Sequence, residues 1–236
     1  RMARFQRFLS EEVVLRSEWN RLGSVRGDPE AIQRHIRRIL ELPVLEVDRI
    51  RERGFRVALD CVRGAGGLMV PQLLEALGCT VSGMDLTPDG YFPRDPEPTA
   101  MNLGGLGSLV RESGSELGFA VDPDVDRLSL VDGEGKPLGE DLTLALCTVV
   151  VLQRRKGPVV MNLSTSRVVA DVVRDCGSRL IRAPVGEVNV SRMMSREGAV
   201  IGGEGNGGVI LPDLNLTRDA SLACALILQH LLDEGI

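Results

Sequence analysis

The sequence predicts an α/β protein of two consecutive α/β domains, each a mixed sheet flanked by helices. One observation is that short apolar runs alternate with longer runs of helical period, in the order strand, loop, helix, strand. A second is that this order occurs twice along the 236 residues. A third is the composition, 43% hydrophobic and 26% charged, which is ordinary for a folded globular chain. We expect a linker, or the tail of a preceding domain, over residues 1–24, and domains over 25–138 and 139–236.

The first domain is predicted to begin with a helix after Asp28. Asp28 is a favourable N-cap residue, and Pro29 suits the first helical position. Ile32 and Ile36 then begin an apolar stripe at helical spacing, and Pro43 ends the helix.

The rest of this domain is predicted from alternating apolar runs and turn residues. A turn over 132–135 is expected to join two strands, and residues 85–109 are expected to be rich in loops. The expected regular elements are strands at 56–60, 79–84, 118–121 and 128–131, and a helix at 69–77 closed by Gly78.

The second domain repeats this order. Its expected strands are 158–162, 180–183 and 199–202, and its expected helices are 141–153, 164–176, 188–195 and 218–233.

Three carboxylates at alternate positions form the first chemical motif. Asp122, Asp124 and Asp126 share one face of an extended backbone, where converging negative charges call for a cation. Oxygen ligands favour Mg²⁺ or Ca²⁺ over zinc. An EF-hand is excluded because its sixth position is Arg127 and its twelfth is Gly133. The alternative is a solvated acidic turn. If a metal binds, Arg127 is well placed to hold a phosphate.

A glycine-rich segment, GGEGNGG, covers residues 202–208. Its only side chains are those of Glu204 and Asn206, a carboxylate and an amide that together suit the vicinal hydroxyls of a sugar. The alternative is a flexible hairpin tip.

Residues 64–67 (GAGG) partly imitate a dinucleotide-binding turn, with Asp85 about 20 residues further on. The third glycine of that pattern is missing, because position 69 is Met. A glycine-rich turn from strand to helix is the stronger interpretation of this segment, and a nucleotide-dependent enzyme the weaker.

Charge and composition exclude several classes of partner. Lys and Arg number 28 against 33 Asp and Glu, a net charge of −5, so neither nucleic acid nor an anionic membrane is an expected partner. No apolar run reaches the ~18 residues of a membrane span. The five cysteines are scattered without a CxxC pair, which suggests reduced thiols in a cytoplasmic protein. The chain starts with Arg1 and shows no secretory signal, and we expect it to be a piece of a longer protein.

These motifs, in this order, resemble the α-D-phosphohexomutases, the family of phosphoglucomutase, phosphomannomutase and phosphoglucosamine mutase. The resemblance runs from about residue 18 to the end of the chain and is carried by the segments EWNRLGSVRGD, VALDCVRGAGG, FPRDPEP, DPDVDRLSLVD, PVGEVNV and GGEGNGGVILP. Members have four domains, and this chain is similar to the second and third. The resemblance implies that Asp122, Asp124 and Asp126 hold Mg²⁺ and that Arg127 contacts phosphate.

The resemblance also implies a substrate site in the second domain. Glu204 and Asn206 would bind sugar hydroxyls, although many members carry Ser where this chain has Asn206. Glu187 falls where members place a polar residue that faces the substrate, so it is expected to be catalytic together with Arg127, and Gly186 beside it is expected to bind the substrate. From the residues alone, Glu187 is an acid at a helix start, stabilised by the helix dipole.

The implied reaction moves a phosphoryl group between C1 and C6 of a hexose or hexosamine phosphate, through a phosphoserine on the enzyme and a bisphosphate intermediate. This chain lacks both the phosphoserine motif of the first domain and the phosphate-clamping loop of the fourth. We therefore expect it to be inactive alone and to work with the remaining domains of the same mutase. The alternative is a non-catalytic protein of this family that binds sugar phosphate or regulates.

Overall fold

The computed structural model describes residues 7, 10 and 17–236 and divides the chain into two units, Arg1–Ala31 and Ile32–Ile236. The first unit carries one short 3-10 helix, η1 (Trp19–Arg21). Most of the tail expected over residues 1–24 lies outside the described residues. The second unit holds both sheets and every feature described below.

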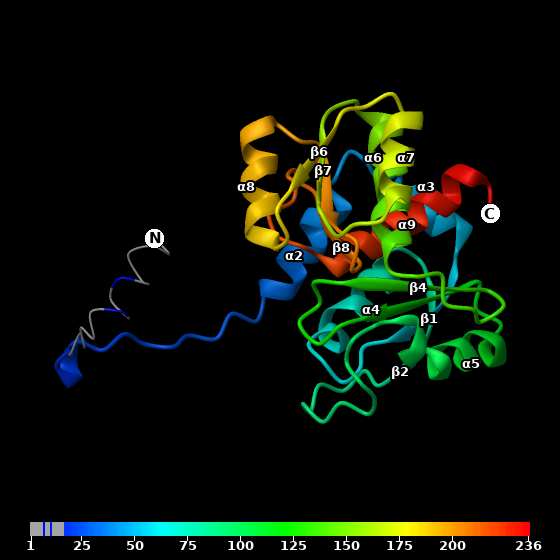
Figure 1. Ribbon diagram of the computed structural model, residues 1–236. Coiled ribbons are helices and arrows are strands. Elements are labelled where there is room, and N and C mark those ends of the chain that lie inside the picture. Colours follow the sequence, from blue (N-terminus) through cyan, green and yellow to red (C-terminus); the bar gives the residue numbers. More distant parts are fainter. Residues whose placement is uncertain (1–6, 8–9, 11–16) are drawn as a thin grey trace. The chain divides into compact units, whose positions relative to one another are not determined.

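Two four-stranded sheets of the same topology form the framework of the second unit (Figure 1). The strand order is β2-β1-β3-β4 in the first sheet and β6-β5-β7-β8 in the second. In each sheet the first three strands are parallel and the last is antiparallel to its neighbour. This confirms two α/β domains with mixed sheets. The strands are β1 (Arg56–Asp60), β2 (Thr80–Met84), β3 (Leu117–Val121), β4 (Leu128–Asp132), β5 (Val159–Asn162), β6 (Leu180–Ala183), β7 (Ile201–Glu204) and β8 (Gly208–Ile210).

Helices cover both faces of each sheet. One face of the first sheet packs under α5, through a cluster that includes Ala58, Leu106 and Val131. One face of the second sheet packs in the same way under α8 (Figure 1). The helices are α2 (Ala31–Leu40), α3 (Val47–Arg53), α4 (Gly66–Ala76), α5 (Gly104–Ser113), α6 (Asp141–Arg154), α7 (Arg167–Asp175), α8 (Glu187–Glu197) and α9 (Ala220–Glu234), with a short 3-10 helix η2 (Ala100–Asn102).

The inner faces of the two sheets share one large hydrophobic core. Helix α9 runs through it, and every residue from Ala220 to Gln229 is buried. It contacts α3 and α4 from the first half and α6 from the second. Because α9 is apolar all round, it can pack against both halves at once.

Two helices and one strand were not anticipated from the sequence, and neither were the short 3-10 helices η1 and η2. Helix α5 begins Gly-Gly-Leu-Gly, and glycine disfavours helix, so the region was expected to be loop. Helix α3 has seven residues, which is too short to show a clear period. Strand β8 is three residues long and lies inside the glycine-rich motif.

Several expected boundaries were wrong by two or three residues. Helix α4 begins at Gly66 rather than at residue 69, and α9 begins at Ala220 rather than at residue 218. The strand expected at 199–202 is β7 and ends at Glu204, so the first glycines of the motif belong to a strand. The helix expected from residue 164 begins at Arg167, because the hydroxyls of Ser164 and Thr165 bond to Asn162 instead. The turn over 132–135 is present, but only an isolated bridge follows it, between Val131 and Pro137.

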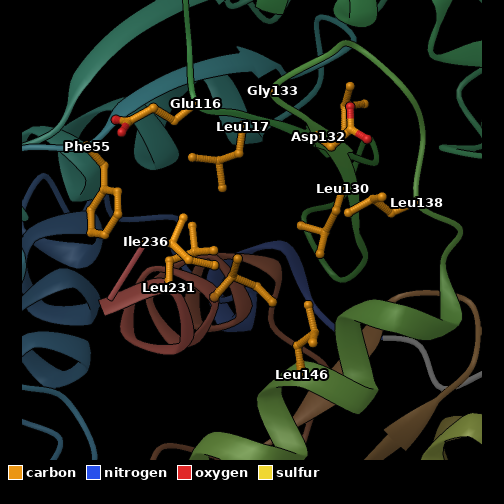
Figure 2. A pocket seen from close by; sticks show the side chains of 12 residues that line it. Phe55, Glu116, Leu117, Leu130, Asp132, Gly133, Leu138, Leu146, Leu231 and Ile236 are labelled. Atoms are coloured by element: carbon orange, nitrogen blue, oxygen red, sulfur yellow. The ribbon is translucent and has the colours of Figure 1, made fainter. Parts of the chain in front are cut away.

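A cavity of about 140 Å³ lies between the first sheet and α9 (Figure 2). Its walls are mainly apolar side chains, such as Leu117, Leu130 and Leu231. It is therefore a gap in the packing between the two halves. Within the described part of the chain, each helix is too short or too polar to pass through a lipid bilayer.

Candidate functional site

Two connections between neighbouring strands meet at one place in the molecule. Residues 122–127, which we call the acid loop, join β3 to β4, and residues 205–207, which we call the glycine turn, join β7 to β8. The backbone N–H of Leu128 donates to the carbonyl of Gly207 at 3.1 Å, and Arg127 forms an antiparallel bridge with Gly208. The structure thus brings together the two motifs that the sequence singled out.

Asp122 organises the acid loop. Its carboxylate is fully buried, and Oδ1 accepts the backbone N–H groups of Asp126 at 3.0 Å and Arg127 at 3.1 Å. Oδ2 accepts from Arg127 Nε at 2.6 Å. Burial alone would raise the pKa of Asp122, but the hydrogen bonds, led by that from Arg127, hold it below its ordinary value. Val125, which is β-branched, has φ of 65°, a strained conformation that the loop must enforce.

The three aspartates converge as a cation site requires. Each offers one oxygen, and these oxygens lie within 4.8 Å of one another. Asp122 is buried, Asp126 half-buried and Asp124 exposed. Burial, and after it the neighbouring Asp122 carboxylate, raises the pKa of Asp126 to about 7. A donor set of carboxylate oxygens fits a divalent ion such as Mg²⁺.

Arg127 bridges the acid loop and a loop that precedes η2. Besides Asp122, it binds both carboxylate oxygens of Glu97, through Nη1 at 2.5 Å and Nη2 at 3.2 Å. Glu97 and Asp122 raise the pKa of Arg127, so the guanidinium stays charged. Glu97 is exposed and occupies the two-pronged position that a phosphate could take on this arginine.

Glu204 is 5% exposed and already satisfied by protein donors. Oε1 accepts from Asn162 Nδ2 at 2.7 Å and from the N–H of Gly186 at 3.0 Å. Oε2 accepts from Arg218 Nη1 at 2.8 Å. The carboxylate therefore holds three segments of the second half together, and the role in binding hydroxyls stays a prediction.

The other residues predicted for this site lie close by. Glu187, at the start of α8, accepts from the hydroxyl of Thr217 and from the N–H of Arg218 at 3.0 Å. Asn206 is half-buried in the glycine turn, where its Oδ1 accepts from the N–H of Gly208 at 3.3 Å. The roles of Gly186, Glu187 and Asn206 toward a substrate likewise stay predictions.

Sequence reasoning missed Arg218 and Asn162. Arg218 Nη2 binds Asp126 Oδ2, so this side chain joins the acid loop to Glu204. One signal in the sequence was Gly208, since a Cβ there would collide with the Cδ of Arg218. Asn162 ends β5 and is 3% exposed, and a polar residue at the carboxyl end of a buried strand is a common mark of a site.

Close backbone packing accounts for two of the glycines in residues 64–67, and one of them packs against the acid loop. The N–H of Ala65 donates to the carbonyl of Pro123 at 2.8 Å. A Cβ on Gly64 would lie 2.5 Å from the Cα of Pro123. This close approach of two backbones explains Gly64, and Gly67 faces the backbone of Leu86 in the same way, so neither glycine requires a nucleotide.

An open hollow of about 410 Å³ borders the acid loop. Asp124 and Val125 line one side, and Thr217 and Arg218 line the other. Unlike the apolar cavity of Figure 2, this hollow adjoins the charged groups and has room for a ligand of several atoms beside them.

Comparison with known proteins gives consistent matches over most of the chain. Residues 33–135 match the family model described as "Phosphoglucomutase/phosphomannomutase, alpha/beta/alpha domain II", and residues 139–236 match that of domain III. A "Probable phosphoglucosamine mutase" from Methanopyrus kandleri is 37% identical over 92% of this chain and 47% of its own length. A "Phosphoglucomutase/phosphomannomutase" from Thermococcus kodakarensis is 36% identical over 97% of this chain and 50% of its own length.

A solved structure agrees with these sequence matches. A phosphoglucomutase/phosphomannomutase family protein from Burkholderia thailandensis superposes with a TM-score of 0.81 and 26% identity, over 97% of this chain and 48% of that one. The chain thus spans about half the length of the relatives it matches.

Proposed function

This chain belongs to the phosphoglucomutase/phosphomannomutase family, and on that premise we propose that it is the metal- and sugar-binding core of a phosphohexomutase. The substrate would be a hexose or hexosamine phosphate, and the reaction the transfer of a phosphoryl group between C1 and C6. The observation that carries the proposal is the convergence of the acid loop on the glycine turn and Arg218.

In this proposal Asp122, Asp124 and Asp126 hold Mg²⁺, which when bound would neutralise charge on a transferring phosphoryl group. Asp122 fixes the loop through its two backbone hydrogen bonds, so the aspartate oxygens are positioned before any ligand arrives. Arg127 supplies a second positive charge. It would exchange the exposed Glu97 carboxylate for a phosphate with the same two-pronged geometry.

The second half would orient the sugar. Glu204 and Asn206 present a carboxylate and an amide beside the acid loop, and the glycine turn leaves the backbone open to close approach by hydroxyls. Gly186 and Glu187 border the same region through Glu204 and Arg218. The phosphoserine and the clamp for the distal phosphate would come from the remaining domains of the mutase.

Titration of the chain with MgCl₂ by calorimetry tests the metal site. We expect one Mg²⁺ site. Asp124→Asn removes one of the three carboxylates and should weaken Mg²⁺ binding at least 100-fold. Asp124 is the position to change because it is exposed, so the substitution should leave the fold undisturbed. Asp171→Asn on α7 is the matched control, since Asp171 pairs with Arg174 at the surface of that helix. A chain that binds no Mg²⁺, or an unaffected Asp124→Asn, would refute the proposal.

Activity is tested by fusing the chain to the first and fourth domains of the Methanopyrus kandleri relative. With Mg²⁺ present, we expect the chimera to interconvert the 1- and 6-phosphates of at least one of glucose, mannose or glucosamine. A folded chimera that binds Mg²⁺ but converts none of them would favour the non-catalytic alternative.

A further inference from the structure

Arg218 connects the two halves of the site more directly than any residue singled out from the sequence. Its Nη2 binds Asp126 Oδ2 in the acid loop, and its Nη1 binds Glu204 Oε2 at 2.8 Å. The side chain is only 16% exposed, so these two ion pairs lie in partly desolvated surroundings where they are stronger than at an open surface.

The backbone around Arg218 is fixed on both sides, so the guanidinium reaches the site from a defined position. Its own N–H donates to Glu187 at 3.0 Å, and the N–H of Ala220, two residues on, donates to the carbonyl of Val125 at 3.0 Å. Asp219 caps α9 by accepting from Leu222 at 3.0 Å. The stem passes over Gly208, where any larger residue would collide with it.

The contacts of Arg218 leave one donor unused. Nε is buried and finds no hydrogen-bond acceptor among the described residues, and the nearer Glu187 oxygen is 3.6 Å away. An unpaired buried N–H costs free energy. The guanidinium of Arg218 is therefore held in place by the ion pairs of its two terminal nitrogens, and its Nε does not contribute.

Asp126 is the partner open to exchange. It contributes to the converging set of three carboxylates, and the oxygen that Arg218 occupies belongs to that set's half-buried member. Arg127 differs, because its Nε binds the fully buried Asp122 and lies 3.5 Å from the other oxygen of Asp126. A cation entering between the three aspartates would therefore meet Arg218 as a competing positive charge on Asp126, while Arg127 is anchored on Asp122.

We propose that Arg218 is a positioning residue that acts as an internal counter-cation, competing with a divalent metal ion for Asp126 while tying the acid loop to Glu204. Metal binding at the aspartates then loosens the Asp126 contact and leaves Arg218 on Glu204, with a donor turned toward the hollow that Asp124 and Thr217 also line. This inference rests on the proposed metal site.

The competition predicts that substituting Arg218 raises the affinity for Mg²⁺ instead of lowering it. Removing a residue that only supports the fold should weaken metal binding, whereas removing a competing cation should strengthen it. We expect Arg218→Gln to tighten Mg²⁺ binding about tenfold in calorimetric titration of the 236-residue chain. Arg218→Lys, which keeps the charge but not the two-pronged geometry, should give a smaller gain. Arg174→Gln is the matched control, because Arg174 also lies between two carboxylates, Asp171 and Asp175, on exposed α7.

A second measurement uses the unaltered chain and so does not depend on how a variant folds. The Nε–H signal of Arg218 in an arginine-labelled NMR sample should shift during the Mg²⁺ titration and saturate with the calorimetric affinity. Unchanged or weaker Mg²⁺ binding by folded Arg218→Gln would overturn the inference, as would an Nε–H signal that stays fixed while Mg²⁺ binds. A parent chain that binds no Mg²⁺ would instead refute the proposed function, and with it the premise of this inference.

Discussion

The two halves of the molecule share one strand order and differ in the connection between the last two strands of each sheet. In the first half that connection carries three carboxylates held by a buried aspartate. In the second half it is three residues long, Gly205 to Gly207, and its neighbour Gly208 makes room for the side chain of Arg218, which comes just before α9. The same connection therefore carries a cluster of carboxylates in one half, and in the other it is a short glycine-rich turn that leaves room for an arginine side chain.

The carboxyl ends of β1 and β5 show a related contrast. Asp60 ends β1 and accepts from the N–H of Val62 at 2.8 Å and from Arg94 at 2.8 Å. Asn162 ends β5 and instead donates to Glu204 while accepting from Thr165. The first half uses charge at this edge to fix its own loops, and the second uses an amide to hold the carboxylate of the site.

The largest expected effect comes from substituting Asp122, the aspartate that holds the acid loop in place. Asp122→Ala leaves the Nε of Arg127 and two part-buried backbone N–H groups without an acceptor, and we expect a loss of about 3–5 kcal/mol in the free energy of unfolding. Asp122→Asn keeps an acceptor for the N–H groups and should lose about half as much. Urea unfolding measures both, and a loss below about 1 kcal/mol for Asp122→Ala would mean that the loop does not depend on this carboxylate.

A smaller effect should follow from filling the open space of the second half. Gly208→Ala places a methyl group against the stem of Arg218, and we expect a loss of about 2 kcal/mol from overpacking. Gly104→Ala is the control, because a Cβ at that position of α5 meets nothing within 4 Å. Equal unfolding free energies for the two variants would show that Arg218 moves aside freely.

The smallest expected effect is a pH dependence confined to the first half. Burial opposes ionisation of Glu116, but hydrogen bonds from the N–H of Arg56 and from Arg53 hold its pKa below the ordinary 4.5. A lowered folded-state pKa gives stability that is complete above about pH 4.5 and is lost as the pH falls through the folded value.

Comparing the parent with Glu116→Gln isolates this contribution, because the other titrating groups are shared. The parent should be more stable at pH 6, by about 1 kcal/mol or less, and the difference should shrink by pH 3. Urea unfolding at both pH values measures it. A difference that grows with acidity would contradict the expected sign.

The sequence predicted most strands of both sheets, since each is a short buried run bounded by turn residues. It also located the acid loop and the glycine-rich motif, because their residue types are unusual at those spacings. It could not predict α5, where tertiary packing overrides the poor helix propensity of three glycines. Nor could it assign a partner to Arg218, whose contacts lie 14 and 92 residues away along the chain.

Helix α9 limits how the two halves of the molecule can move relative to one another. Its buried apolar residues belong to the core that both sheets share, so a movement of one half against the other would have to disrupt the packing of this helix. Asp126 and Glu204 then belong to one rigid unit. Any opening or closing next to this rigid unit would have to come from a part that packs against it from outside.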